Sequence, residues 1–420
     1  MVLIILATIS INAVIGEDGI IKRAESARQH QLNAEASDNE ALDELEAIIK
    51  QNTPFEVSKV TDTTPGELAG KGTEAEPYLI ESIEDLIQFS NNVSNGTLYA
   101  NEYVKITQDL DFNSEKSYVD AKNVELFGDY NGDGEVKGIK EEVIDKNNRG
   151  FISIGKMENN TLFSGIFNGN NATIANLYIN DKENDSIGLF TGNLGTITNL
   201  NLTGNIASTT DDSTVKIGGI SGYNRANIEN CSTKIIFDIN TECEVGGIVG
   251  TMDEGIVKNC INNSELQISG HYGWGIFVGG IAGVHNDGVI KNSKNYGKVI
   301  ATNAGDYLCC GGISGNSLGE INGCINYGDI YAEGGEPWVG GISGDAGSKN
   351  KDRCYNLGNI KVVSAPYENG YSCPFVGGVF GYTSGDSISN CYNTGDIEVV
   401  DSKIQSEKLW IYLRRILWSI

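Results

Sequence analysis

The hydrophobic pattern from about residue 188 onward is a series of short alternations. Apolar and polar residues alternate in runs of four to six, and glycine and asparagine separate the runs. Alternation with a period of two is typical of β-strands that bury one face, and Gly and Asn tolerate the positive φ angles of tight turns. The pattern therefore predicts many short strands joined by tight turns.

The same pattern recurs as an internal repeat. Its first half reads Gly-Gly-Ile-x-Gly or a close variant, and the second glycine of each copy lies at 188, 219, 247, 280, 312, 341 and 378. The copies are 28 to 37 residues apart. A second signature follows 12 or 13 residues after each marker, of the type Ile-x-Asn-Cys-x-Asn-x-Gly-x-Ile, with good copies at Ile321–Ile330 and Ile388–Ile397. This fixed internal offset identifies a repeat protein.

A unit of this length cannot bury its own apolar face and must stack on its neighbours. We therefore predict an all-β fold, a right-handed parallel β-helix with one coil per unit and about 8–10 coils at ~4.8 Å each. Aliphatic side chains would form ladders inside, and asparagines at equivalent positions would form amide ladders along the turns. A β-propeller is the alternative, although its blades usually need ~40–50 residues.

The N-terminal part departs from the repeat. An apolar run over residues 1–15 is shorter than the ~20 residues that span a bilayer and lacks a basic n-region, and a charged stretch follows it to about Lys50. We predict an N-terminal α-helix within 1–52 and a linker over 53–70. Residues 71–150 would cap the β-helix, with a helix that begins after Ser82, has Asp85 at its third position and turns Leu86 and Phe89 to its apolar side.

The repeat region extends over 151–400, and an atypical tail follows over 401–420. The tail carries two of the four tryptophans together with basic residues. Two interpretations remain open for it: a basic amphipathic helix that lies on a membrane surface, or a segment read out of frame after an interrupted repeat.

Composition excludes several classes of protein. Glycine accounts for 53 of 420 residues and proline for only 6, without a Gly-X-Y period, which excludes collagen. Hydrophobic residues at 40% argue against bulk disorder. A formal net charge of −26 argues against a nucleic-acid partner, since such proteins neutralise phosphates with basic side chains.

The nine cysteines do not form a disulfide pattern. Five of them occupy one slot of five repeats, at Cys231, Cys260, Cys324, Cys354 and Cys391, while Leu200 and Ser293 occupy that slot in two others. We predict a ladder of small, buried, reduced side chains there. The other four, Cys243, Cys309, Cys310 and Cys373, lie shortly before Gly-Gly pairs. No Cys-x-x-Cys pair is present, which argues against zinc.

Catalytic candidates are few. The histidines are His30, His271 and His285, and no His-Glu-x-x-His motif occurs. Asp109 and Asp111 would share one face of a strand over 103–111, as in a β-helix glycosidase, but acidic pairs are common in so acidic a chain, and a solvated face is the simpler interpretation. We predict no enzyme activity and no cofactor.

One segment has the spacing of an ion site. In Asp129-Tyr-Asn-Gly-Asp-Gly134, the oxygens of Asp129, Asn131 and Asp133 match the first half of an EF-hand-type calcium loop. Lys140 stands where that loop needs its bidentate acid, so the site would bind Ca²⁺ weakly. The alternative is an Asx-rich turn.

The repeats resemble the GLUG motif of bacterial surface proteins, which is named for its Gly-Leu-x-Gly core. The resemblance covers about residues 151–400, and Gly72–Ile80 is similar to the opening segment of such proteins. The apolar segment, its Gly-Asp-Gly break and the charged segment after it resemble the N-terminus of pilin-like proteins, without the usual cleavage motif. Both resemblances imply export to the cell surface, with membrane association through the N-terminal segment.

The resemblance implies an adhesin-like or structural protein that contacts a surface ligand, either a glycan or a host or matrix protein. Contact would come from turns and inserts, with aromatic candidates at Tyr272, Trp274 and Trp338, although these side chains could equally pack on the coil surface. Three alternatives stay open: a pilin-like fibre subunit, a carbohydrate-active enzyme, and a non-catalytic fragment of a larger surface peptidase.

Overall fold

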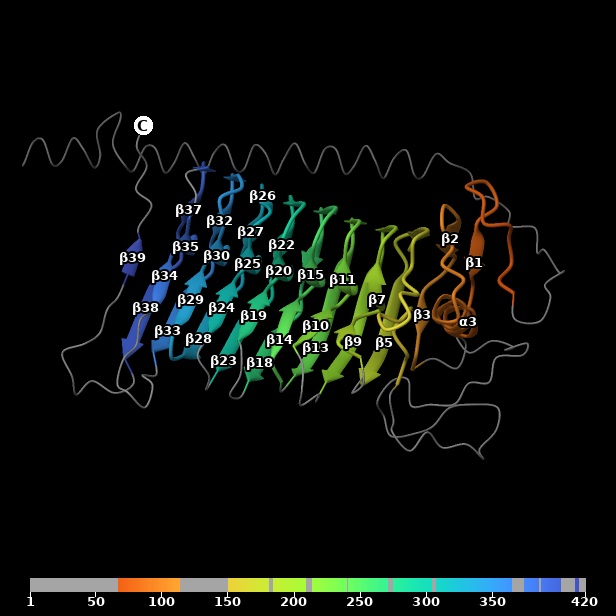
Figure 1. The fold of residues 1–420 in the computed structure, drawn as a ribbon, viewed down its shortest axis with the longest axis horizontal. Helices are drawn as coiled ribbons and strands as arrows, with labels where there is room; N and C mark the ends of the chain where they lie inside the picture. Colours follow the sequence, from red (N-terminus) through yellow and green to blue (C-terminus); the bar gives the residue numbers. More distant parts are fainter. Residues whose placement is uncertain are drawn as a thin grey trace, which may run out of the picture. The chain divides into compact units, whose positions relative to one another are not determined.

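The described part of the chain is a parallel β-helix, in which one coil follows another along a single long axis (Figure 1). The computed structural model describes residues 67–113, 150–180, 184–208, 214–239, 241–270, 275–303, 307–364, 374–384, 387–401 and 412–414. The named strands pair with strands of neighbouring coils, and these pairings are parallel, as between β10 and β14. The predicted β-helix is confirmed. The β-propeller is wrong, because the strands of one repeat do not pair with one another as the strands of a blade would.

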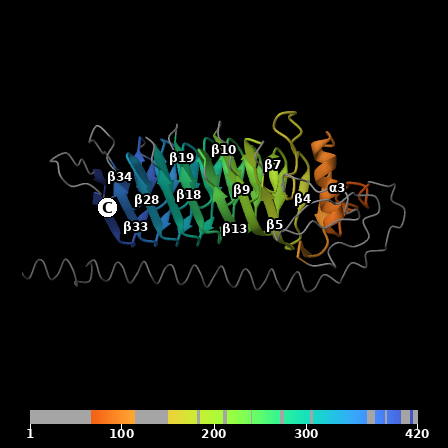
Figure 2. The ribbon, with the colours of Figure 1, turned by 90° about the horizontal axis from the view of Figure 1, so that it is seen from below.

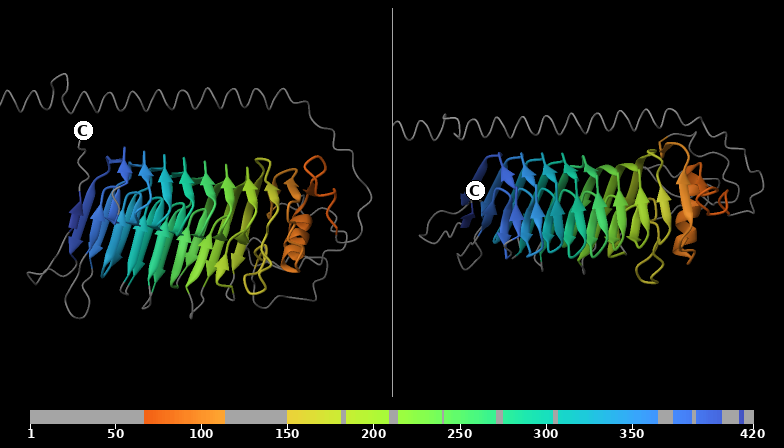
Figure 3. Two further views of the ribbon diagram at one scale, coloured as in Figure 1. Left: turned by 45° about the horizontal axis from the view of Figure 1, so that its top comes forward. Right: turned by 90° about the horizontal axis from the view of Figure 1, so that it is seen from above.

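From β4 onward the coils contribute strands to four sheets, which Figure 3 shows as rows of parallel arrows. The first sheet has ten strands among the described residues. They are β1 (Tyr78–Ile80), β2 (Tyr103–Ile106), β4 (Ile166–Asn168), β8 (Thr196–Thr198), β12 (Asn227–Glu229), β16 (Ile256–Lys258), β21 (Val289–Lys291), β26 (Glu320–Asn322), β31 (Lys351–Asp352) and β36 (Ile388–Ser389).

The second and third sheets have eight and seven described strands. The eight-stranded sheet contains β6 (Ser186–Ile187), β10 (Val215–Gly218), β14 (Cys243–Gly246), β19 (Ile276–Gly279), β24 (Leu308–Gly311), β29 (Pro337–Gly340), β34 (Phe375–Gly377) and β39 (Tyr412–Arg414). The seven-stranded sheet contains β7 (Phe190–Asn193), β11 (Ser221–Asn224), β15 (Val249–Met252), β20 (Ala282–His285), β25 (Ser314–Ser317), β30 (Ser343–Ala346) and β35 (Phe380–Thr383).

The fourth sheet has fourteen described strands, because most coils contribute two short strands to it. They are β3 (Leu110–Asp111), β5 (Thr173–Asn180), β9 (Asn201–Ser208), β13 (Ser232–Ile239), β17 (Ile261–Asn262), β18 (Leu266–Gly270), β22 (Lys294–Asn295), β23 (Val299–Asn303), β27 (Ile325–Asn326), β28 (Ile330–Gly334), β32 (Tyr355–Asn356), β33 (Ile360–Ser364), β37 (Tyr392–Asn393) and β38 (Ile397–Asp401).

The Gly-Gly-Ile-x-Gly half of each repeat forms the corner between the eight- and seven-stranded sheets. In one copy Gly218 ends β10, Ile220 is buried at the corner, and Gly222 lies in β11. A Cβ on Gly222 would lie 2.5 Å from the backbone nitrogen of Ile187 and 2.8 Å from the carbonyl oxygen of Lys216. The glycines therefore allow strands of the two sheets to approach each other closely.

The Asn-Cys half of each repeat forms the corner between the ten- and fourteen-stranded sheets. Asn230 takes a φ of 55° there, and Asn199, Asn259 and Asn292 do the same in other coils. Asparagine tolerates this left-handed conformation better than other residues with a Cβ. Cys231 follows and points into the core. Each half of the sequence repeat therefore forms a corner of the coil.

The core is a set of aliphatic ladders along the axis. One of them consists of residues paired in register in the eight-stranded sheet and fully buried: Ile187, Ile217, Val245, Val278, Cys310, Val339 and Val376. Removal of this apolar surface from water is the main favourable term for such a stack.

Helix α3 (Ile83–Ser94) covers the N-terminal end of the stack (Figure 2). The Ser82 hydroxyl accepts a hydrogen bond from the Asp85 backbone N–H at 3.2 Å, and Leu86 and Phe89 are fully buried. The Phe89 ring packs 5.6 Å from those of Phe163 and Phe167. The predicted helix, its cap and its apolar side are confirmed, and β1 and β2 continue the ten-stranded sheet of the repeats.

Differences in repeat length occur mainly at one corner, between the fourteen-stranded and the eight-stranded sheet. There β28 ends at Gly334 and β29 begins at Pro337, whereas β33 ends at Ser364 and β34 begins at Phe375. The predicted N-terminal helix within 1–52, the linker up to residue 66 and most of the 401–420 tail lie outside the described residues. No helix in the described part of the chain is long and apolar enough to cross a membrane.

Candidate functional site

A ladder of five asparagines, the first four of them fully buried, shapes the fourteen-stranded sheet. Successive amides are linked by hydrogen bonds in which one Nδ2 donates to the next Oδ1, at 2.7, 2.8, 2.7 and 2.6 Å. The members are Asn262, Asn295, Asn326, Asn356 and Asn393. Each Nδ2 also donates to the carbonyl oxygen two residues later, as Asn326 does to Gly328 at 2.8 Å. The predicted amide ladder is therefore present.

This ladder decides where the strands are split. An asparagine that binds the backbone two residues later closes a small turn, so β27 ends at Asn326 and β28 begins only at Ile330. The position in register with Asn262 is Thr233 in β13, and Leu202 takes it in β9. Neither forms that turn, and both strands extend without a break over eight residues.

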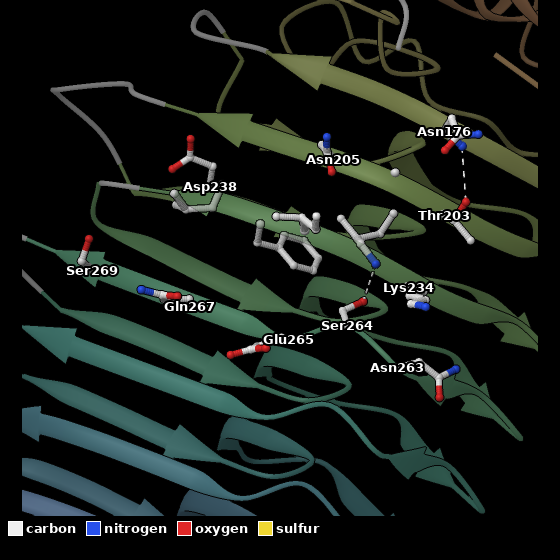
Figure 4. Close-up of a pocket in the computed structure, with 15 residues that line it drawn as sticks. Asn176, Thr203, Asn205, Lys234, Asp238, Asn263, Ser264, Glu265, Gln267 and Ser269 are labelled. Carbon is white, nitrogen blue, oxygen red and sulfur yellow. Dashed lines mark hydrogen bonds between the residues drawn. The ribbon is translucent and has the colours of Figure 1, made fainter. Parts of the chain in front are cut away.

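A depression in the surface lies where the unbroken strands meet the split ones, and we call it the outer hollow (Figure 4). Its volume is about 1110 Å³. Fifteen residues of the fourteen-stranded sheet and its turns line it: Asn176, Thr203, Gly204, Asn205, Lys234, Ile235, Ile236, Phe237, Asp238, Ile239, Asn263, Ser264, Glu265, Gln267 and Ser269.

A bulge in β5 forms one side of the outer hollow. The register between β5 and β9 shifts between Ile174 and Leu177, and Asn176 has a φ of 57°. Opposite it, Gly204 has a φ of 151°, and a Cβ there would lie 1.9 Å from the Leu177 carbonyl oxygen. Only glycine fits both conditions. On the other side, the Ser264 hydroxyl accepts a hydrogen bond from the Ile235 N–H at 2.8 Å.

The outer hollow combines one exposed apolar side chain with many polar ones. Ile236 is 67% exposed, the largest value among the exposed large hydrophobic residues of the described chain. Its register partners are Asn205 on β9 and, one residue beyond the paired stretch of β18, the exposed Glu265. Lys234 and Asp238 lie two residues before and after it on the same face of β13. Such a surface can form hydrogen bonds with a ligand around a small apolar centre.

His285 is not available for chemistry at the surface. It is fully buried in β20, and its Nδ1 lies 3.0 Å from the Ser317 hydroxyl oxygen. Burial, together with the nearby Lys351 ammonium, lowers the pKa of His285 to about 3. The imidazole is thus neutral and enclosed. His30 and His271 lie outside the described residues.

Asp109 and Asp111 both accept hydrogen bonds from residues of β5 in the next coil. Asp109 accepts a hydrogen bond from the Thr173 N–H at 2.7 Å, and Asp111 accepts one from the Asn176 side-chain amide at 2.8 Å. The predicted strand over 103–111 is wrong in its extent, because β2 ends at Ile106 and β3 begins at Leu110. Asp109 thus precedes the strand that contains Asp111.

The eight described cysteines are free and buried. In the repeated slot each thiol donates to the carbonyl oxygen two residues earlier and to one of the preceding coil, as Cys260 does to Lys258 and Ile228 at 3.4 and 3.6 Å. Burial raises the pKa of Cys324 to about 12. The predicted ladder of reduced thiols is confirmed for these residues, while Cys373 lies outside the described part.

The remaining predicted site residues fall into two groups. Asp129, Asn131 and Asp133 lie outside the described residues, as do Tyr272 and Trp274, so weak calcium binding there remains a prediction. Among the described residues no group of three or more His, Cys, Asp or Glu side chains could hold a metal ion. Trp338 is not in an insert but in β29, half-buried against other aromatic rings.

Sequence reasoning did not find the outer hollow, although two signals point to it. The second half of the repeat signature lacks Asn-x-Gly in the copies that contain β9 and β13. Ile235, Ile236 and Phe237 also form an apolar run in which one member must face solvent if the strand continues.

Comparison with known proteins gives limited similarity. No protein-family model matches the chain. Halomucin of Haloquadratum walsbyi (strain DSM 16790 / HBSQ001) is 26% identical over 189 residues, which cover 44% of this chain and only 2% of halomucin. A crystal structure from Bacteroides ovatus, described as a "putative immunoglobulin A1 protease", has a TM-score of 0.46 and 18% identity, and the match covers 79% of this chain and 86% of that one. This chain thus corresponds to a small fraction of the length of halomucin.

Proposed function

We propose that this chain is the repeat region of an exported cell-surface protein, of GLUG type, that binds a surface ligand and catalyses no reaction. The observation that carries the proposal is the outer hollow, an exposed isoleucine within a ring of polar side chains on an otherwise regular stack. A β-helix supports such a role because its backbone is rigidly paired between coils, so the outward side chains keep fixed positions.

Two further observations support binding without catalysis. The one described imidazole is enclosed and neutral, and the acidic pair at Asp109 and Asp111 accepts hydrogen bonds from a neighbouring coil. Export is supported by the resemblance of the repeats to those of bacterial surface proteins. Contact of residues 1–52 with a membrane is a separate prediction, which protease treatment of intact cells would test together with surface exposure.

Binding is tested with the full chain on an array of glycans and extracellular matrix proteins. Ile236→Asp places a charge at the centre of the outer hollow, and we expect at least a tenfold loss of binding to at least one ligand that the unchanged chain retains. The matched control is Ile256→Asp, because Ile256 is also an exposed isoleucine, at 37%, but lies on β16 of another sheet. Equal binding by both variants would reject the outer hollow as the site.

A hydrolysis screen with the same glycans tests the second half of the proposal. Release of reducing ends by the unchanged chain, abolished by replacement of a single carboxylate, would show an enzyme and overturn a purely binding role.

A further inference from the structure

A cluster of five aromatic rings lies on a different face from the outer hollow, over the eight- and seven-stranded sheets. We call Phe277, Tyr307, Trp338, Phe375 and Tyr382 the Trp338 cluster. Trp338 is at its centre, with ring centroids 5.1 Å from Tyr307, 5.0 Å from Phe375 and 5.0 Å from Tyr382. Tyr307 also lies 5.7 Å from Phe277.

Three rings of the cluster lie on the outer side of the eight-stranded sheet, while Tyr382 belongs to the seven-stranded sheet. Phe277, Cys309, Trp338 and Phe375 are paired in register, whereas the residues that follow them, such as Val339, point into the core. In the earlier coils the same row contains Lys216 and Glu244. The row therefore changes from charged to mainly aromatic along the axis, and its member Cys309 is fully buried.

Polar groups from the facing sheet lie beside these rings. Asn316, Asp345 and Tyr382 are paired in register in the seven-stranded sheet, and the contact of Tyr382 with Trp338 places this row against the cluster. Two polar atoms here are buried and have no hydrogen-bond partner: Nε1 of Trp338 and Oδ1 of Asn316. A buried donor or acceptor without a hydrogen-bond partner is unfavourable, so one donor and one acceptor at this place indicate a site that a polar ligand can complete.

Rings and unpartnered polar groups together identify the chemistry of that partner. The C–H face of a sugar ring packs against an aromatic ring, and its hydroxyls both donate and accept hydrogen bonds, as Asn316 Oδ1 and Trp338 Nε1 require. The net charge of −26 and the nearby Asp345 carboxyl disfavour an acidic polymer. We propose that the Trp338 cluster is a second binding site, which takes a neutral saccharide.

The covered state of the two polar atoms implies a movement on binding. Tyr382 is the most exposed residue of the cluster, at 37%, and its ring contacts that of Trp338. Under this proposal a ring of the cluster, such as that of Tyr382, moves when the sugar enters, so that the sugar hydroxyls can reach the two polar atoms.

Affinity gel electrophoresis of the full chain tests this site, with hydroxyethylcellulose, galactomannan or yeast mannan in the gel and polygalacturonate as the acidic polymer. We expect at least one neutral polymer to retard the chain and polygalacturonate to leave it unretarded. Trp338→Ala should reduce retardation at least tenfold. Trp338→Phe keeps a ring but removes the Nε1 donor, and it should weaken binding severalfold while the unfolding midpoint stays close to that of the unchanged chain.

Two controls separate this site from others. Tyr296→Ala removes an exposed tyrosine, 47% accessible, that stacks on Tyr327 next to the fourteen-stranded sheet, and it should leave retardation unchanged. Ile236→Asp should do the same, since it affects only the outer hollow. The proposal is overturned if no neutral polymer retards the chain, or if polygalacturonate retards it as strongly as the neutral polymers do. It is also overturned if Trp338→Phe and Trp338→Ala are retarded as strongly as the unchanged chain.

Discussion

The unbroken strands β9 and β13 and the split strands of the later coils occupy the same sheet but present different outer surfaces. In the split coils a buried asparagine turns its amide onto the backbone and ends the strand, as Asn326 does. In the unbroken coils, Leu202 and Thr233 occupy the equivalent positions and the strand continues. One buried side chain per coil therefore sets the shape of the outer face, and the outer hollow lies where the two kinds of coil meet.

The largest expected effect comes from breaking the amide ladder. Asn326→Ala removes four hydrogen bonds, so that Asn295 Nδ2 and Asn356 Oδ1 each lose one buried partner and the Gly328 N–H and carbonyl oxygen lose their side-chain partner. Since each unsatisfied buried group costs about 1–3 kcal/mol, we expect a loss of about 3 kcal/mol or more in the free energy of unfolding, measured by denaturant titration. Asn263→Ala, an exposed neighbour of the ladder, should cost under about 0.5 kcal/mol. Similar losses for both would show that the ladder is not a source of stability.

The next effect concerns the unbroken strands. Gly204→Ala should cost about 2–3 kcal/mol, because its Cβ would overlap the Leu177 carbonyl and its φ of 151° disfavours a side chain. Gly96→Ala separates the two causes, since Gly96 has a φ of 103° and no atom within 4 Å of the added Cβ. We expect about 1 kcal/mol there. If Gly204→Ala costs no more than Gly96→Ala, the bulge adapts and does not fix the outer hollow.

Acid should lower the free energy of unfolding through His285, which lies in a coil with split strands. Its folded-state pKa of about 3 lies below the unfolded value of about 6.5, so the unfolded chain takes up a proton first as the pH falls. Stability is present above pH 6.5 and is lost from there down to pH 3, by about 2 kcal/mol between pH 8 and pH 5 for this group.

His285→Met isolates the contribution of that imidazole. Met252 occupies the register position of His285 in the preceding coil and is fully buried, so methionine fits this row. Between pH 8 and pH 5, the free energy of unfolding of the variant should fall by about 2 kcal/mol less than that of the unchanged chain, as measured by denaturant titration. Lys351 and Asp287, the other charged groups that act on His285, are retained in it. Identical pH profiles would contradict this role.

The smallest expected effect is in the thiol ladder. Cys324→Ser should cost about 1 kcal/mol, since Ser293 holds the same slot and donates to Lys291 at 3.2 Å. Cys243→Ser buries a hydroxyl in a strand position where the described chain offers the thiol no hydrogen bond, and it should cost about 2 kcal/mol. The unfolding midpoints of the two variants show whether the repeated slot accepts oxygen in place of sulfur. A larger loss of stability for Cys324→Ser than for Cys243→Ser would show that it does not.

The repeat was enough to predict the stack, because a coil's hydrophobic positions, corner glycines and asparagines recur at fixed offsets. The cap around Ser82 was predictable for the same reason, since it depends on a local signal. The outer hollow was not, because it requires the positive φ of Asn176 and the close approach at Gly204, which arise only when coils pair. The surroundings of Trp338 and His285 also depend on which rows face each other across a corner, and no single repeat contains that information.

The corner between the fourteen- and eight-stranded sheets has a consequence for how such chains change during evolution. Long and short connections follow β33 and β28, yet β34 still pairs with β29 in register through Val376 and Val339. Insertions and deletions at this corner therefore leave the pairing of successive coils unchanged. Natural variation, or a peptide grafted there by an engineer, can alter what the protein displays at that edge while the inherited scaffold remains the same.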